Sequence, residues 1–320
     1  MLKFIYNIKL LHYMDYTILT IMDQDMLKKI AKKSSETDIE YYHSKMNDKI
    51  FTFLNPIKFP ERIAPLLMAG SVSDGAIVQV NSIDRTLGEI ILGLDSLNVN
   101  NVLFLVPQEN VDSFKPLIKN TNLQNSKIAE PTVENIISFL NDLKRENIPQ
   151  GEGYIVVDQS FSVKGVGTVA LGFVKEGRIQ KHMECRVYPS PKMSEIKSIQ
   201  VQDVDVEYAD VGTRVGVALR GVNPDDVPRG SILASHERFS TSVSFRMKVR
   251  KHPIIKDNLV INSKVTLYMD FGRYSSTISD VAGDKILFDF ENDVTITNDV
   301  YVISHQDRPP RVYGSGIVIR

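Results

Sequence analysis

Residues 158–172 read DQSFSVKGVGTVALG, two alternating runs on either side of a glycine-containing turn. Gly165 and Gly167 permit the tight turn that leads from one strand into the next. Further runs rich in Val, Ile and Thr occur at 168–174, 196–206, 215–219, 242–249 and 300–304. Gly, Pro, Asn and Asp interrupt these runs about every ten residues, a pattern that predicts β-barrels rather than helices.

The first half of the chain has a different pattern. Short apolar runs at 17–22, 50–54, 76–80 and 102–106 predict strands, and segments with helical spacing lie between them. One helix is predicted over 87–97 and another over 133–143, with Thr132 as its N-cap. Alternating strands and helices predict an α/β domain with a mostly parallel sheet and helices on both faces.

The change of pattern predicts three domains. The α/β domain is placed at 16–150, and a first barrel at 151–237 begins after the linker IPQGEG at 148–153. A second barrel is placed at 238–320. Residues 1–15 are interpreted either as an extension upstream of the first strand or as a short docking helix.

Composition excludes several classes of protein. The 320 residues contain 38 Lys and Arg against 39 Asp and Glu, so a polycation is excluded, whereas a local basic patch for RNA is not. The single cysteine, Cys185, excludes a disulfide framework and a four-thiolate zinc site, and no metal site is predicted. No stretch approaches the roughly 20 apolar residues that span a bilayer. We expect a cytoplasmic protein without a DNA or membrane partner.

The α/β half lacks the motifs of nucleotide chemistry. No Gly-x-x-x-x-Gly-Lys-Ser/Thr occurs, although this loop is what wraps phosphates in P-loop proteins. The loop after the first strand contains Asp23 and Asp25, which would repel phosphate. Four lysines follow at helical spacing and are expected on a solvated helix face: Lys28, Lys29, Lys32 and Lys33. No catalytic residue is predicted, since a Gly-x-Ser-x-Gly elbow is also absent.

Two blocks of the first barrel carry a family resemblance. Residues 158–172, followed by VGTRVGVALRGV at 211–222 and VPRGSILA at 227–234, resemble the two signatures of domain 2 of translational GTPases of the elongation factor Tu type. The pair His252-Pro253 and the segment RPPRVYGSGIV at 308–318 resemble the third domain of selenocysteine-specific elongation factors. The resemblance implies a P-loop GTPase-like α/β domain followed by two β-barrels.

The chain departs from that family at the positions that would hold GTP. Asn55-Pro56-Ile57-Lys58-Phe59 stands where the family has Asp-x-x-Gly and a histidine, so Lys58 replaces the glycine and Phe59 the histidine. The guanine-reading motif falls at 106–109, with Gln108 and Glu109. The one Asp-x-x-Gly, at 280–283, is expected to be a turn. With Asp23 and Asp25, these positions predict a degenerate nucleotide site, and no cofactor is expected.

The resemblance also implies a pocket for the aminoacyl end of tRNA. The matching positions are Asp158, Gln159, Phe161, Leu171 and Arg214. We expect Phe161 and Leu171 in the core, and Arg214 either on an anion or beside a carboxylate on the strand surface.

The leading hypothesis is therefore an elongation factor-like protein without GTPase activity that binds tRNA or a ribosome-associated partner through its barrels. One alternative is a GTP-binding elongation factor with an unorthodox site for GTP and Mg²⁺, which would use the loop after the first strand and Lys58. Another is a protein-interaction module that regulates a true elongation factor. The sequence leaves the oligomeric state open.

Overall fold

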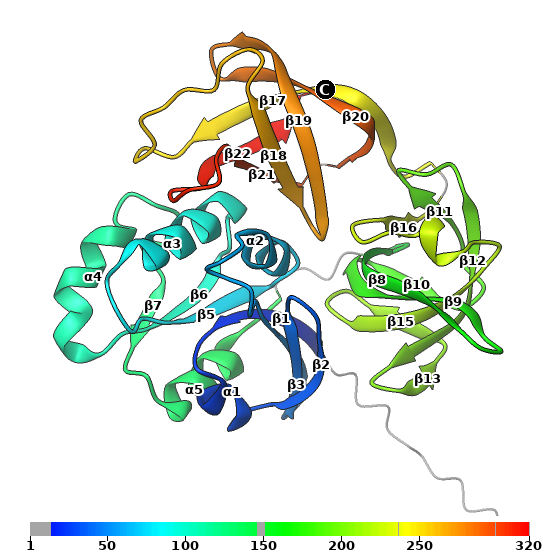
Figure 1. The fold of residues 1–320 in the computed structure, drawn as a ribbon. Coiled ribbons are helices and arrows are strands. Elements are labelled where there is room, and N and C mark those ends of the chain that lie inside the picture. Colours follow the sequence, from blue (N-terminus) through cyan, green and yellow to red (C-terminus); the bar gives the residue numbers. More distant parts are fainter. Residues whose placement is uncertain (1–13, 146–150, 236, 298, 320) are drawn as a thin grey trace, which may run out of the picture.

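Three large sheets and one small one make up the structure, a computed structural model that describes residues 14–145, 151–235, 237–297 and 299–319 (Figure 1). The first large sheet belongs to the N-terminal α/β domain, and the other two close into barrels. The small sheet pairs Arg178–Gln180 with Tyr208–Asp210. The predicted fold class is confirmed. The predicted limits of the three domains stay predictions. Residues 1–13 of the predicted N-terminal extension and 148–150 of the linker lie outside the described residues, whereas Met14 and Asp15 of that extension belong to the first strand.

The α/β domain has one mixed sheet of order β2-β3-β4-β1-β5-β6-β7. Strand β1 lies parallel to β4 and β5, and β6 and β7 continue the parallel part, whereas the β2–β3 and β3–β4 pairs are antiparallel. The strands are β1 (Met14–Ile21), β2 (Lys32–Glu36), β3 (Glu40–Met46), β4 (Lys49–Asn55), β5 (Gly75–Gln79), β6 (Asn101–Leu105) and β7 (Lys127–Ala129).

Helices cover both faces of this sheet because successive residues of a buried strand point to opposite sides. Ile18 packs in the cluster that contains α5, whereas Leu19 packs in the cluster of α2 and α3. The Thr132 hydroxyl accepts a hydrogen bond from the Asn135 N–H, as predicted for this N-cap. The helices are α1 (Gln24–Lys28), α2 (Ala64–Ser71), α3 (Arg85–Leu97), α4 (Val111–Ile118) and α5 (Val133–Asp142), with a 3-10 turn at Gln108–Asn110.

The first barrel has the strand order β11-β16-β8-β9-β15-β12, and pairing of β12 with β11 closes it. Gly165 and Gly167 have φ of 82° and 103°, so the predicted turn between β8 and β9 uses backbone angles that favour glycine. The run predicted at 196–206 is two strands, separated by a turn at Gln202 and Asp203. The strands are β8 (Tyr154–Val163), β9 (Gly167–Glu176), β10 (Arg178–Gln180), β11 (Glu184–Tyr188), β12 (Met193–Val201), β13 (Val204–Val206), β14 (Tyr208–Asp210), β15 (Arg214–Arg220) and β16 (Ile232–Ala234), with a 3-10 turn at Pro224–Asp226.

The second barrel is closed in the order β17-β20-β19-β18-β21-β22. The Asp-x-x-Gly at 280–283 is only partly the predicted turn. Asp280, Val281 and Ala282 are the last residues of β19, and only Gly283, with a φ of 64°, lies in the turn before β20. Its strands are β17 (Ser240–Lys251), β18 (Lys264–Met269), β19 (Gly272–Ala282), β20 (Lys285–Ile296), β21 (Tyr301–Ser304) and β22 (Val312–Val318).

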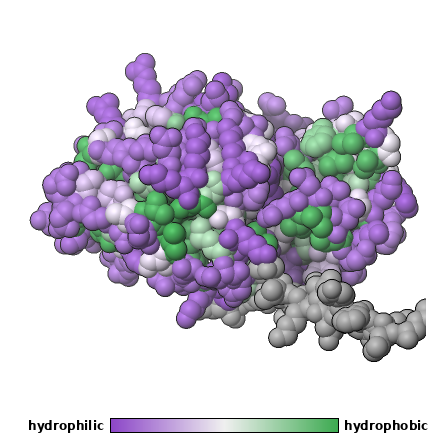
Figure 2. Space-filling model, turned by 90° about the horizontal axis from the view of Figure 1, so that it is seen from below, coloured by the Kyte–Doolittle hydropathy of each residue, from purple (hydrophilic) through white to green (hydrophobic). Residues whose placement is uncertain are grey.

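The second barrel lies over α2 and α3, and the first barrel lies beside the β2–β3 hairpin (Figure 1). The face seen from below is mostly polar, with hydrophobic residues in separate patches (Figure 2). Among the described residues, no helix is long and apolar enough to cross a membrane.

Candidate functional site

The positions predicted for a degenerate nucleotide site gather around one edge of the α/β sheet. Because β1, β4, β5 and β6 are parallel, their carboxyl ends meet there. Asp23 follows β1, and its carboxylate accepts a hydrogen bond of 2.8 Å from the Gln79 amide at the end of β5. The Asp23 N–H donates back to Gln79 Oε1 at 3.1 Å. The gap between β1 and β5 is therefore bridged by two hydrogen bonds within the protein.

Glu40, the first residue of β3, is the centre of a second network at this edge. The side chain is 2% exposed. Its Oε1 accepts hydrogen bonds from Gln24 Nε2 at 2.9 Å and Lys33 Nζ at 2.7 Å, and its Oε2 accepts from Asn55 Nδ2 at 3.0 Å and the Tyr42 hydroxyl at 3.2 Å. Burial by itself would raise the pKa of Glu40, but the hydrogen bonds from Lys33 and Asn55 outweigh it and lower the pKa.

The segment after β1 corrects the prediction for the four lysines. Helix α1 has five residues and ends at Lys28, and Lys32 and Lys33 begin β2. The four side chains are exposed but do not share a helix face. Leu27 and Ile30 are buried, so their packing ends the helix and directs the chain into the hairpin.

The other predicted positions take no part in the hydrogen bonds to Glu40. Lys58 is exposed in the turn after β4, and Phe59 is half-buried against the core on the α2 side. Gln108 and Glu109 form an exposed 3-10 turn after β6. Asp25 is exposed in α1.

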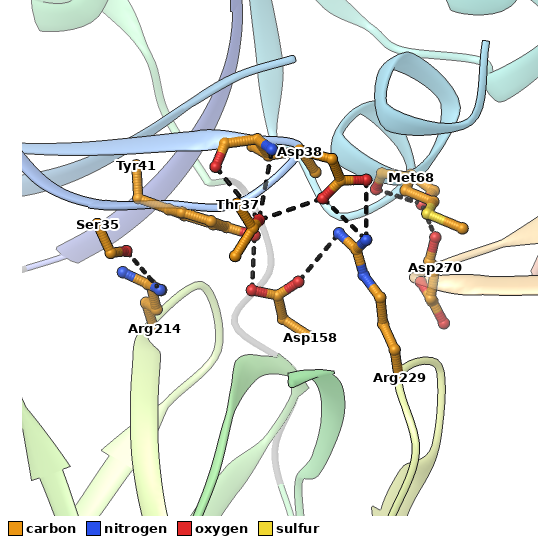
Figure 3. Close-up of polar contacts among 11 residues, drawn as sticks. Ser35, Thr37, Asp38, Tyr41, Met68, Asp158, Arg214, Arg229 and Asp270 are labelled. Carbon is orange, nitrogen blue, oxygen red and sulfur yellow. Dashed lines mark hydrogen bonds and ion pairs between the residues drawn. The ribbon is translucent and has the colours of Figure 1, made fainter. Parts of the chain in front are cut away.

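A second polar cluster lies where the tip of the β2–β3 hairpin meets the first barrel (Figure 3). Asp158 is 2% exposed and accepts a hydrogen bond of 2.6 Å from the Tyr41 hydroxyl. Arg229 Nη2 lies 3.1 Å from Asp158 Oδ1, and Arg229 Nη1 donates to both carboxylate oxygens of Asp38 at 2.9 Å. Burial raises the pKa of Asp158, while Arg229 and Tyr41 oppose the rise. Asp158 is thus occupied by contacts within the chain.

Arg214, at the start of β15, forms no ion pair with a carboxylate of the described residues. Its guanidinium lies 3.9 Å from the centre of the Tyr41 ring, and Nη2 donates to the Ser35 hydroxyl at 3.2 Å (Figure 3). The Arg214 Nε is buried and has no hydrogen-bond partner among the residues that the structure describes. Burial lowers the pKa of Arg214. The expectation of a carboxylate partner on the strand surface is therefore wrong.

Four of the five positions predicted for the aminoacyl pocket divide between two hollows, Asp158 and Gln159 in one and Leu171 and Arg214 in the other. We call them the Asp158 hollow, of about 510 Å³, and the Arg214 hollow, of about 460 Å³. The first is lined by Thr37, Asp158, Gln159, Ser160, Pro224, Asp225, Pro228 and Arg229. The second is lined by Asp15, Lys32, Ser34, Ser35, His43, Thr52, Leu171, Gln200, Val201, Gln202, Asp203, Arg214, Val215 and Gly216.

Phe161 and Leu171 were expected in the core, and the structure corrects both. Phe161 is 40% exposed because it lies close to the β8–β9 turn. Leu171 is half-buried and lines the Arg214 hollow. Phe161 lines neither of the two hollows.

Sequence reasoning missed the α/β side of the Arg214 hollow. Lys32 pairs directly with His43 across the β2–β3 ladder, and His43 pairs with Thr52. Directly paired residues share one face of a sheet, so these three form a polar row toward the first barrel. Only the strand register brings these three residues together, so no short sequence motif predicts the row.

Comparison with known proteins agrees with this architecture. Residues 167–234 match the family Elongation factor Tu domain 2. An uncharacterised protein of Methanocaldococcus jannaschii is 31% identical over 268 residues, which cover 83% of this chain and 87% of that protein. The selenocysteine-specific elongation factor of the same organism is 27% identical over 82% of this chain, and the match spans 61% of the factor's length. Translation elongation factor SelB of Methanococcus maripaludis, in complex with the GTP analogue GppNHp, superimposes with a TM-score of 0.82 at 22% identity, over 96% of this chain and 79% of that one.

An α/β domain followed by two closed barrels, with this domain 2 signature, defines a member of the translational GTPase superfamily. Within it, this chain belongs to one family with the uncharacterised protein of Methanocaldococcus jannaschii and is a homologue of the selenocysteine-specific elongation factor.

Proposed function

We propose that this chain is an elongation factor-like protein that works without GTP and binds the acceptor end of a tRNA in the Arg214 hollow. The observation that carries the proposal is the contrast between two polar sites on the same hairpin. The carboxyl edge of the sheet is filled by the chain's own hydrogen bonds, whereas the Arg214 hollow has unpaired hydrogen-bonding capacity. The protein would act in the cytoplasm, where tRNA is found.

The residues at the carboxyl edge do not fit a nucleoside triphosphate. The Glu40 carboxylate would repel phosphate, and its donors Gln24, Lys33 and Asn55 are already engaged. Helix α1 is also too short to supply an N-terminal anion site. Together with the missing phosphate loop, these features support a protein that neither binds nor hydrolyses GTP.

The Arg214 hollow has the chemistry for the end of an aminoacylated RNA. Lys32, His43 and Arg214 supply positive charge or hydrogen-bond donors for phosphate, and the orphaned Arg214 Nε is a buried donor beside them. Asp15 and Asp203 also line the hollow and suit the ammonium group of an aminoacyl ester. A ligand that carries both an anion and an amine matches this lining better than a simple polyanion.

A binding titration with deacylated and aminoacylated tRNA tests this proposal. We expect binding that weakens as salt increases, because neutralising phosphates releases counterions. Replacing Arg214→Ala should weaken binding about tenfold, the loss of roughly one charge-assisted hydrogen bond. Arg178→Ala is the matched control, since it removes one arginine of the same barrel that is paired with Asp210 and lies outside the hollow.

The other hypotheses give different results. A protein-interaction module predicts no RNA binding even at low salt, and that outcome would overturn the RNA part of the proposal. A GTP-binding factor with an unorthodox site predicts nucleotide binding that depends on Lys58. Equal losses with Arg214→Ala and Arg178→Ala would show general electrostatic attraction instead of a site.

A further inference from the structure

The β2–β3 hairpin lies between the carboxyl edge of the α/β sheet and the barrels. Along β3 the side chains alternate, so Glu40 and Tyr42 lie on one side and Tyr41 on the other. Glu40 and Tyr42 belong to the hydrogen-bond network at the carboxyl edge. Tyr41 packs in the core cluster that also contains residues of both barrels. A single strand therefore joins both regions.

Aromatic rings from all three domains stack beside this strand. The Tyr41 ring centre lies 6.5 Å from that of Phe173 in the first barrel, with an angle of 27° between the planes. Phe173 in turn lies 5.8 Å from Phe271 of the second barrel at 28°. Arg214 covers the Tyr41 ring, and the Arg229 guanidinium lies 5.3 Å from the Phe271 ring centre. The stack makes one continuous contact across the three domains.

Polar contacts fix the tip of the hairpin in the same position (Figure 3). Asp38 and Asp158 share Arg229, and Asp158 also accepts the Tyr41 hydroxyl. Asp158 is almost fully buried, and separating the two domains would take the Tyr41 hydroxyl away from Asp158 and the Asp38 carboxylate away from Arg229.

The second barrel is joined to its neighbours by further buried charges. Lys175 of the first barrel donates to Asp270 at 2.7 Å, and Asp270 is 1% exposed. The Ser71 hydroxyl of α2 donates to the Asp270 carbonyl at 2.8 Å. Arg311 of β21–β22 forms a buried pair with Glu89 of α3 and donates from Nε to Oε1 at 2.9 Å. Each pair of domains thus has its own buried polar contact.

We propose that the β2–β3 hairpin is a permanent internal strut that fixes the first barrel against the α/β domain and, together with the buried pairs of the second barrel, keeps the three domains in one closed arrangement without any ligand. A translation factor that changes shape on binding GTP needs an element whose position depends on the nucleotide. Here Glu40 holds one face of the hairpin beside its turn, and Asp38 and Tyr41 hold the turn and the opposite face, so both attachments come from the protein itself. The inference goes beyond the proposed function, because it applies whichever ligand the Arg214 hollow binds.

Distances between spin labels on the full-length protein test the strut. Labels at Lys119→Cys, Lys197→Cys and Lys285→Cys place one exposed site in each domain, and the native Cys185 is fully buried. For each pair of sites we expect one narrow distance distribution, unchanged by millimolar GTP and Mg²⁺. Several populations, or a shift with GTP, would overturn the proposal.

The double variant Asp38→Asn with Tyr41→Phe removes the tip contacts and nearly preserves side-chain shape. We expect a broader distribution, displaced by several ångströms, between the α/β domain and the first barrel. Asp210→Asn is the control, because it breaks an exposed ion pair within that barrel and should change nothing. An unchanged distribution in the double variant would overturn the strut. If circular dichroism shows that the double variant is unfolded, the same distance is measured in the single variant Asp38→Asn. An unchanged distribution there would also overturn the strut. The distances are measured without RNA, so they do not depend on the outcome of the tRNA titration.

Discussion

Both faces of the β2–β3 hairpin carry polar residues. The two faces differ in whether the hydrogen bonds of these residues are already made within the chain. At the carboxyl edge, four donors surround Glu40, and both of its oxygens are satisfied. In the Arg214 hollow, the buried Arg214 Nε has no partner among the described residues, although the guanidinium stacks on Tyr41. A buried polar group without a partner costs free energy, so a protein tends to keep one where a ligand completes it. The comparison teaches that the polarity of a site says less about function than whether its hydrogen bonds are already made.

We expect the largest effect on stability from removing the Glu40 network at the carboxyl edge of the sheet. Glu40→Ala leaves the buried groups of Tyr42 and Asn55 without their acceptor, so we expect the free energy of unfolding to fall by about 3 kcal/mol. Glu36→Ala removes the other, exposed carboxylate that pairs with Lys33, and should cost less than about 1 kcal/mol. Urea denaturation of both variants measures the difference. Similar losses of stability in the two variants would show that the Glu40 network is no more stabilising than an exposed ion pair.

Acid should remove the contribution of Glu40. Its pKa is lower in the folded protein than in the unfolded chain, so its stabilising effect is complete above about pH 4.3 and is lost as the pH falls through the folded value. The stability difference between the wild type and Glu40→Gln should therefore be largest near neutral pH and shrink below about pH 4. Denaturation curves across this range test the sign, and a difference that grows in acid would contradict it.

A smaller effect of pH on stability, with the opposite sign, is expected from Asp15 in the Arg214 hollow. Burial raises the pKa of Asp15 to about 6, despite the Thr213 hydrogen bond and nearby Arg145. The folded state therefore loses stability as the pH rises from about 4 to 6, and Asp15→Asn should stabilise the protein at pH 7 by about 1 to 2 kcal/mol. The gain should vanish near pH 4. Thermal melting at both pH values measures it, and destabilisation at pH 7 would contradict this account of the hollow.

Arg214→Ala should have the smallest effect on folding. Its stacking on Tyr41 and its one hydrogen bond to Ser35 predict a loss of about 1 kcal/mol. The same substitution should weaken tRNA binding about tenfold, so function and stability separate at this residue. A large loss of stability, measured by urea denaturation, would assign Arg214 a structural role instead.

Local patterns predicted most of the fold. The alternation and glycines of 158–172 predicted the first barrel, and apolar spacing predicted the helices over 87–97 and 133–143. The same reasoning failed for Lys28–Lys33, because a short helix and the start of a strand can present similar spacing over six residues. Burial of Leu27 and Ile30, a tertiary effect, decided where the helix ends.

Only the first-barrel side of the candidate site could be predicted from the sequence. The resemblance pointed to Asp158 and Arg214, but not to their partners, because Tyr41 and Ser35 are more than 100 residues away in sequence. Lys32 and His43 meet through strand register, which composition does not record. Phe161 looked like a core residue by type, and only its place next to a hairpin turn exposes it.

Calorimetric titration of the intact protein with GTP and GDP, in the presence of Mg²⁺, tests the central claim most directly. The filled carboxyl edge predicts no binding at millimolar nucleotide, for the wild type and for Lys58→Ala alike. Binding at micromolar concentration would contradict the account. It would mean that the nucleotide displaces the Glu40 network and that the chain retains the molecular switch of its superfamily.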